Sequence, residues 1–88
     1  MRVEYRASFA KDLRSVRDKG LSKQIMETIE LVEHAHRLEE IANLKKLKGK
    51  GNYFRIKIGE YRIGIAVEND MVTFVRCLNR KEIYRYFP

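Results

Sequence analysis

Hydrophobic positions recur at helical spacing in the first part of the chain and alternate in the later part. Residues 2–6 alternate between charged and less polar side chains, which predicts a short first strand. Apolar side chains in residues 9–19 recur at spacings of three and four, which predicts a helix. We expect Ser8 to cap the start of this helix and Gly20 to end it.

A second amphipathic helix is predicted over residues 23–35, with Ser22 at its start. Its apolar positions form one stripe with flanking residues, so the two helices are expected to form a hairpin that buries this stripe on a sheet. The positions concerned are Ile25, Met26, Ile29, Leu31 and Val32.

A β-meander is predicted after a polar, glycine-containing loop at residues 36–51. Residues 53–58 and 61–67 alternate and are separated only by Gly59 and Glu60, which suits a two-residue turn with Gly at its first central position. These features predict a β-hairpin.

A third meander strand at residues 72–78 follows a turn at Asn69-Asp70, and residues 81–87 are expected to form a terminal helical turn. The order strand, helix, helix, strand, strand, strand predicts an α+β fold with the helices on one face of the sheet. At this length we expect a single domain, residues 1–88.

The two-residue turn also fixes the register of the hairpin. Ile58 is placed opposite Tyr61 and Lys57 opposite Arg62, and cross-strand partners share a face. One face is therefore apolar and is expected to lie under the helices. It carries Phe54, Ile56, Ile58, Tyr61, Ile63 and Ile65. The other face carries Tyr53, Arg55, Lys57, Arg62, Gly64 and Ala66.

This second face has three cations and no acidic residue. Like charges directly opposite each other, as at Lys57 and Arg62, destabilise a sheet. Gly64 and Ala66 are small and are expected to leave a depression beside the cations, where the backbone of a ligand can approach. The pattern favours an anion-binding site.

The third meander strand has two possible orientations. With a two-residue turn, Phe74, Arg76 and Leu78 fall on the apolar face, which suits Arg76 poorly. One additional loop residue reverses the strand and buries Val75 and Cys77 instead.

The net charge of +7 is concentrated in the later part of the chain. Residues 1–44 sum to zero, residues 45–62 to +6, residues 63–75 to −2 and residues 76–88 to +3. A concentrated basic surface attracts polyanions and makes their binding steeply salt-dependent.

No apolar run is long enough for a membrane span, and the charged N-terminal segment does not resemble a signal peptide. Cys77 is the single cysteine, so no internal disulfide forms, and we expect a cytoplasmic protein with no membrane association. Cys77 is expected to be a small core residue. His34 and His36 lack Cys or carboxylate partners at ligand spacing, so neither a metal site nor a cofactor is expected.

Three segments in the later part of the chain resemble RelE/ParE-type toxins of toxin–antitoxin pairs. They are FRIK at 54–57, YRI at 61–63 and NRKEIY at 79–84, and they follow a Leu-Lys-Gly loop. The upstream strand and helices agree with the same fold. The resemblance implies a cognate antitoxin as partner, and a toxin–antitoxin complex that binds its own operator DNA.

RelE-like members of this family enter the ribosomal A site and cleave mRNA. The resemblance implies the same activity here, without a metal, through attack of the RNA 2′-OH on the adjacent phosphate. The catalytic residues that it implies are Arg55, Lys57, Arg62, Arg80 and Tyr84. The residues expected to contact the RNA backbone are Lys45, Lys46, Lys48, Lys50 and Lys81.

Each implied residue has chemistry that suits cleavage. Arg55 and Arg62 suit bidentate contacts with phosphate oxygens, and Arg80 is a further phosphate ligand. Lys57 can exchange a proton, which Arg does not do in proteins. Tyr84 can stack on a base or position the 2′-OH, or it packs in the core.

Two positions depart from common family choices. Arg55 stands where a Lys is often found, and a permanently charged Arg does not act as a base. Asn79 stands where many relatives have His, so one acid/base group is lacking.

Two other functions fit the same fold. A ParE-like toxin inhibits DNA gyrase and has no nuclease activity of its own. A non-enzymatic module binds nucleic acid together with its antitoxin. Tyr86 and Phe87 are either core residues or a cover for the antitoxin's docking site.

Overall fold

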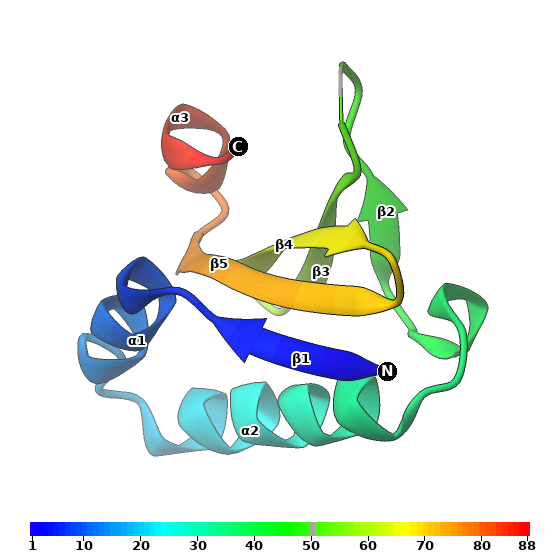
Figure 1. Ribbon diagram of the computed structural model, residues 1–88. Coiled ribbons are helices and arrows are strands. Elements are labelled where there is room, and N and C mark those ends of the chain that lie inside the picture. The colour runs from blue at the N-terminus through cyan, green and yellow to red at the C-terminus, as the bar shows by residue number, and fades with distance from the viewer. Residues whose placement is uncertain (50) are drawn as a thin grey trace.

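The computed structural model describes residues 1–49 and 51–88. Its strands form one sheet in the order β1-β5-β4-β3-β2, with β1 parallel to β5 and the other neighbours antiparallel (Figure 1). This arrangement, with its helices, confirms the predicted α+β class. The strands are β1 (Arg2–Tyr5), β2 (Leu44–Lys46), β3 (Tyr53–Ile58), β4 (Tyr61–Glu68) and β5 (Met71–Asn79). The helices are α1 (Ala7–Arg14), α2 (Lys19–His34), the 3₁₀ helix η1 (Leu38–Glu40) and α3 (Ile83–Tyr86).

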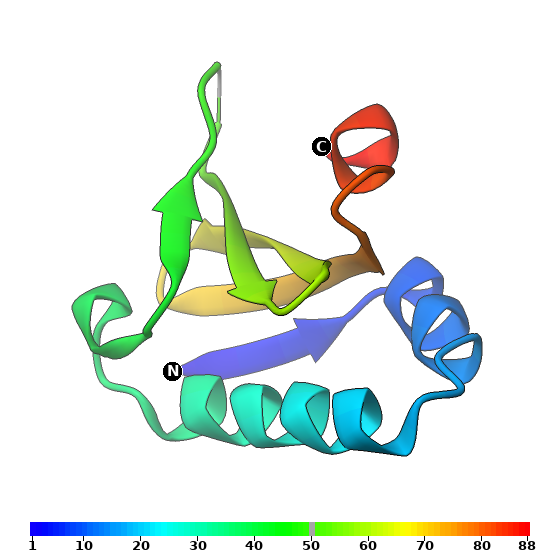
Figure 2. The same ribbon diagram turned by 180° about the vertical axis from the view of Figure 1, so that it is seen from behind.

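The two faces of the sheet are covered by different parts of the chain. The long helix α2 runs along one face, α1 lies beside the end of β5, and α3 lies over the opposite face (Figures 1 and 2). The expectation of helices on one face is therefore confirmed for α1 and α2, whose buried residues share one core, whereas the terminal helical turn is on the other side. The main core lies between α1, α2 and the sheet, and contains Phe9, Ile25, Ile29, Val32, Ile56, Ile63, Ile65, Val72, Phe74 and Cys77.

The predicted hairpin register is confirmed. Ile58 pairs with Tyr61 and Lys57 with Arg62, and Gly59 has a φ of 54°, as a turn with Gly at its first central position requires. The apolar face carries four buried isoleucines beneath the helices, as expected. They are Ile56, Ile58, Ile63 and Ile65.

A β-bulge in β5 resolves the question of its orientation. Ile65 pairs with Phe74 and Gly64 with Arg76, so Val75 is an extra residue on the β5 side. The bulge changes which face the following residues occupy. Phe74 and Cys77 are consequently both buried in the core, and Arg76 lies on the other face. Each of the two alternatives was right for half of the strand.

The predicted helix starts were wrong. The hydroxyl of Ser8 does not cap α1 but donates to Val75 O at 2.6 Å, because α1 begins where β1 leaves the edge of β5. Gly20 lies in the first turn of α2, whose true cap is Asp18, which accepts from Leu21 N at 3.0 Å. Ser22 is therefore inside α2. Met26 and Leu31 point away from the core and are exposed.

The strand β2 was missed in a segment expected to be a loop. It is only three residues long and pairs antiparallel with β3, with Lys45 opposite Arg55. The structure thereby extends the cationic face of the sheet by one strand.

The C-terminal segment folds back over the sheet. Its helix α3 confirms the predicted helical turn, and Ile83 and Phe87 are buried on the face opposite α2. Among the helices that the structure describes, none is long and apolar enough to cross a membrane.

Candidate nucleic-acid interface

The face of the sheet that α2 leaves uncovered carries rows of cations. The ladder places Lys45, Arg55, Gly64 and Arg76 side by side across β2, β3, β4 and β5. Towards the β3–β4 turn, the next row includes Lys57 and Arg62 as direct partners. Sequence register thus brings five cations onto one face, and Arg76 is the member that has a buried acidic partner.

The side chains of this face already make contacts. Arg62 donates through Nη1 to Gly59 O at 2.8 Å and to Tyr61 O at 2.9 Å, so it folds over its own turn. Arg55 donates through Nη1 to Asn43 O at 2.9 Å. Its Nε is buried without a hydrogen-bond partner in the described part of the chain.

Arg80 has an acidic partner that the sequence did not reveal. Its Nε lies 2.6 Å from Glu60 Oε2, and its backbone N–H donates to Glu60 O at 2.7 Å. Both side chains of this ion pair are more than half exposed, so the pair is weak. Lys81 is exposed, with its N–H bonded to Asn79 Oδ1 at 3.0 Å.

A groove of about 330 Å³ lies between β2 and α3. Three of the predicted RNA-binding lysines and Tyr84, which is 60% exposed, line it. Its lining residues are Lys45, Lys46, Leu47, Lys48, Tyr84, Phe87 and Pro88. Lys50, also predicted to bind RNA, lies outside the described residues. An exposed aromatic ring beside several lysines is the composition that binds single-stranded nucleic acid.

The depression expected at Gly64 is filled. A Cβ built on Gly64 would lie 2.6 Å from Phe87 Cδ2, so the ring of Phe87 rests directly on this glycine. The ring also meets Tyr53 edge-on, with 5.6 Å between centroids. Gly64 therefore admits a side chain of the same molecule, and the expectation that a ligand backbone occupies this position was wrong. Phe87 is a buried residue on this face, as one of the two alternatives had it.

A buried ion pair lies at the β5 end of the cationic face. Asp12, 9% exposed, accepts from Arg76 Nε at 2.8 Å and from Arg76 Nη2 at 3.1 Å. The same carboxylate accepts from Cys77 N at 2.8 Å. The hydrogen bond with Asp12 raises the pKa of Arg76 above its ordinary value. Arg76 is thus engaged within the fold, unlike the exposed Lys57.

Cys77 is a core residue, as expected. Burial raises the pKa of its thiol to about 12, with a further contribution from Asp12, so it stays protonated at neutral pH and is a poor nucleophile. His34 is exposed, and its Nδ1 lies 2.8 Å from Glu30 O. Within residues 1–49 and 51–88, no three His, Cys, Asp or Glu side chains converge as a metal site would need.

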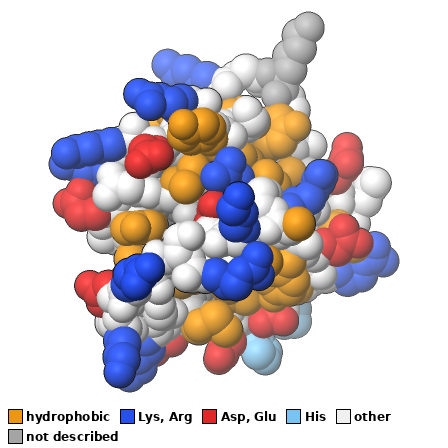
Figure 3. All heavy atoms as spheres, turned by 90° about the vertical axis from the view of Figure 1, so that its left-hand side faces the viewer, with side chains coloured by type: hydrophobic (Ala, Val, Ile, Leu, Met, Phe, Trp, Pro, Cys, Tyr) orange, Lys and Arg blue, Asp and Glu red, His pale blue; other side chains and the backbone are white. Residues whose placement is uncertain are grey.

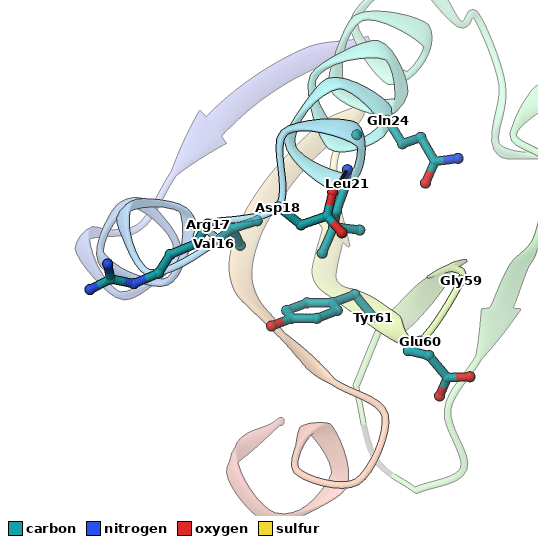
Figure 4. A pocket seen from close by; sticks show the side chains of 9 residues that line it. Val16, Arg17, Asp18, Leu21, Gln24, Gly59, Glu60 and Tyr61 are labelled. Carbon is teal, nitrogen blue, oxygen red and sulfur yellow. Dashed lines mark hydrogen bonds between the residues drawn. The ribbon is translucent and has the colours of Figure 1, made fainter.

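A hollow of about 490 Å³, larger than the groove between β2 and α3, lies between the start of α2 and the β3–β4 turn (Figure 4). Tyr61 lies between the start of α2 and the turn, and Asp18 and Glu60 contribute acidic groups to the lining. The basic Arg17 also lines the hollow, and a surface that combines both signs of charge does not favour a polyanion. Glu60 connects the two surfaces, because it lines this hollow and also pairs with Arg80.

The chain matches a family model over residues 3–84, nearly its whole length. The model is described as "ParE toxin of type II toxin-antitoxin system, parDE". The chain belongs to the RelE/ParE toxin superfamily. It is therefore a toxin of a type II toxin–antitoxin system, as the three sequence motifs indicated.

Individual relatives carry RelE names. The RelE/ParE chain is 43% identical to Toxin RelE3 of Methanocaldococcus jannaschii over the full length of both chains. Putative toxin RelE1 of the same organism is 28% identical, with 91% of this chain and 89% of the relative covered.

Solved structures agree with this assignment. A crystal structure of a RelB-RelE antitoxin-toxin complex from Methanococcus jannaschii superimposes with a TM-score of 0.82 at 41% identity, covering 97% of this chain and 99% of the other. A RelE-RelB complex from Pyrococcus horikoshii gives 0.72 at 23% identity, covering 90% and 93%, and supports the fold.

The structure brings the predicted residues of this RelE/ParE toxin into two groups. Arg55, Lys57 and Arg62 share the sheet face, and Arg80 joins the turn through Glu60. Tyr84 lies with the lysines of β2 in the groove. Two ion pairs were not predicted from the sequence: Glu60 with Arg80, and Asp12 with Arg76. The poor fit of Arg76 to an apolar face was the available signal for the second of these.

Proposed function

We propose that the chain is a RelE-type toxin that cleaves mRNA on the ribosome, without a metal, and so inhibits translation. The observation that carries this proposal is the groove in which Tyr84 faces Lys45, Lys46 and Lys48, next to a sheet face with further cations. Among the described residues of its lining no side chain is a carboxylate or an imidazole, and three are lysines, so the lining side chains suit the charge of a phosphate. The 43% identity to a RelE toxin over the full length supports the same assignment.

The proposed chemistry uses the contacts of the face. The 2′-oxygen attacks the adjacent phosphorus, the bond to the 5′-oxygen breaks, and a 2′,3′-cyclic phosphate forms. Lys57 in its neutral form takes the proton of the 2′-OH and passes it to the leaving 5′-oxygen, because it is the exposed lysine among the cations of the sheet hairpin. Arg55 and Arg62 stabilise the added negative charge on the phosphate oxygens. Arg62 uses Nη1 for its turn, and the rest of its guanidinium is proposed to face the phosphate.

The remaining residues are proposed to hold the message. Tyr84 stacks on a base, and Lys45, Lys46, Lys48, Lys50 and Lys81 bind the mRNA or ribosomal backbone. Arg80 exchanges Glu60 for a phosphate when RNA binds.

The cellular setting follows from the same relatives. We propose a cognate antitoxin as protein partner, because a 41% identical toxin was crystallised with RelB. The complex is proposed to bind its own operator DNA, and the toxin is proposed to act in the cytoplasm.

An in vitro translation assay tests this function. We expect the message to be cut when ribosomes are present, and Arg62→Ala to abolish cutting and growth inhibition while the fold and antitoxin binding remain. Arg85→Ala is the matched control, because Arg85 is an exposed arginine of α3 outside the groove lining. Full toxicity of Arg62→Ala would refute the proposed site.

A second candidate function is inhibition of DNA gyrase, which the description of the matching family model favours. It predicts an intact message together with loss of gyrase supercoiling when the toxin is added. If neither effect is observed, the remaining alternative is a non-enzymatic nucleic-acid-binding partner of an antitoxin.

A further inference from the structure

Arg76 differs from the other cations of the sheet face because its guanidinium is held by an acid of a different element. Two of its nitrogens bond both oxygens of Asp12 in α1. The carboxylate is itself fixed by the N–H of Cys77, the next residue of β5. A bidentate, planar contact of this kind defines the orientation of the guanidinium. Arg76 is therefore a rigid platform and not a free phosphate ligand.

This platform contacts α3. The Cζ of Arg76 lies 5.6 Å from the centre of the Tyr86 ring, within the range of a cation–π interaction. Tyr86 is 51% exposed, so burial alone does not fix its ring. The contact with Arg76 joins Tyr86 to the sheet.

The helix needs such a contact because it is very short. α3 has four residues, and a single helical turn is not stable without tertiary contacts. Ile83 and Phe87 are four positions apart and are both buried, so they lie on one side of the helix, facing the sheet. Residues two positions apart, such as Tyr84 and Tyr86, point to roughly opposite sides. Tyr86 accordingly reaches Arg76 on β5, and Tyr84 reaches the lysines of β2.

Figure 3 shows the side of the molecule on which α1 and α3 lie, with Lys and Arg side chains next to apolar ones. We infer that Arg76 is a positioning residue: anchored by Asp12, it holds Tyr86 and so orients α3 with Tyr84 directed into the groove. The inference rests on the proposed RNA cleavage for its effect on rate, and on the contacts above for its effect on α3.

The test compares Arg76→Lys with Arg85→Lys in the full chain. Lys keeps the charge but loses the bidentate fork and the planar face, whereas Arg85 is exposed on the same helix. The first readout is hydrogen exchange of the Phe87 amide, which bonds to Ile83 O at 2.8 Å and reports on α3. We expect exchange roughly tenfold faster in Arg76→Lys and unchanged in Arg85→Lys.

The second readout is the kinetics of mRNA cleavage. Because Tyr84 is proposed to hold a base of the message, we expect kcat/KM to fall roughly tenfold in Arg76→Lys. Tyr86→Leu should reproduce both effects. Tyr86→Phe should leave both the exchange of the Phe87 amide and the cleavage kinetics at wild-type values, because Phe keeps the aromatic face that the cation contacts.

Unfolding is controlled separately. Exchange of the Ile63 amide in β4 reports on the stability of the sheet. If Arg76→Lys destabilises the whole fold, Tyr86→Leu replaces it as the test variant, because the Tyr86 ring is half exposed and its loss disturbs the core less. Unchanged exchange of the Phe87 amide in Arg76→Lys and Tyr86→Leu would refute the inference, as would faster exchange with unchanged kcat/KM. If the wild type cleaves nothing, the proposed function is wrong, and the exchange of the Phe87 amide still decides whether Arg76 holds α3.

Discussion

The contact between Gly64 and Phe87 makes a sharp prediction about the C-terminal segment. A methyl group on Gly64 would lie 2.6 to 2.8 Å from three atoms of the Phe87 ring, closer than carbon atoms approach in proteins. Gly64 has no positive φ, so the backbone itself accepts alanine. We therefore expect Gly64→Ala to displace the ring, with no strain in the strand.

The magnitude follows from two opposing effects. Overpacking of a tight contact costs about 1–3 kcal/mol. Alanine in place of a strand glycine recovers about 0.5–1 kcal/mol of conformational entropy. The net loss is about 0–2.5 kcal/mol, and it is limited to the 1.5–3 kcal/mol or so that burial of a Phe side chain contributes, because the ring can leave its site.

Urea denaturation of four proteins measures this effect: wild type, Gly64→Ala, Phe87→Ala and the double variant. In the absence of the ring only the entropy gain remains, so Gly64→Ala should stabilise by about 0.5–1 kcal/mol, which gives a coupling energy of about 1–3 kcal/mol. Thermal midpoints should show the same order, at roughly 4–8 °C for each kcal/mol in a domain of this size. Equal costs of Gly64→Ala in both backgrounds would show that Phe87 does not rest on Gly64 in solution.

Three other predictions concern the thiol, the hairpin turn and the groove. Because the pKa of Cys77 is raised, its contribution to stability is present below about pH 9 and is lost as the pH rises towards 12. Cys77→Ala should therefore flatten the alkaline fall in the free energy of unfolding. The same fall in both proteins would refute this. Gly59→Ala should lower stability by about 1 kcal/mol in thermal unfolding, because its φ of 54° disfavours a Cβ, and an unchanged midpoint would contradict this. Neutralising Lys45, Lys46 and Lys48 together should reduce the salt slope of single-stranded RNA binding by about 2 units, measured by titration at several salt concentrations; an unchanged slope would place the RNA elsewhere.

The hairpin was predictable because one turn determined it. Two residues between alternating runs leave a single register, and Gly59 identified the turn type. The bulge at Val75 was not predictable, because nothing local to β5 distinguishes an extra residue in the strand from one in the turn. β2 was hidden by its length, since three residues show no clear alternation.

The charges of the site were predictable, but their partners were not. Register alone placed Lys57 opposite Arg62. The contact of Phe87 with Gly64 depends on the C-terminal segment folding back, and the pairing of Arg76 with Asp12 depends on α1 lying beside β5. Both join segments far apart in the sequence, so spacing along the chain carries no signal for them.

Helix starts failed for a related reason. Ser8 is a good capping residue by type, but the hydroxyl instead satisfies a β5 carbonyl at the point where β1 ends. Competition between a local cap and a distant acceptor is decided by the tertiary structure.

The parallel pairing of β1 with β5 imposes an order on folding. Among the described strands, β5 is the one neighbour of β1. The partner residues of β1 lie far along the chain, from Arg2 with Met71 to Tyr5 with Phe74. The meander of β3, β4 and β5 can form by local contacts, whereas β1 can pair only once β5 is in place. Loop closure of this length is slow compared with hairpin formation. We therefore expect the docking of β1 and α1 to follow formation of the meander, and because this docking brings Asp12 to Arg76, the sheet face acquires its final form only then.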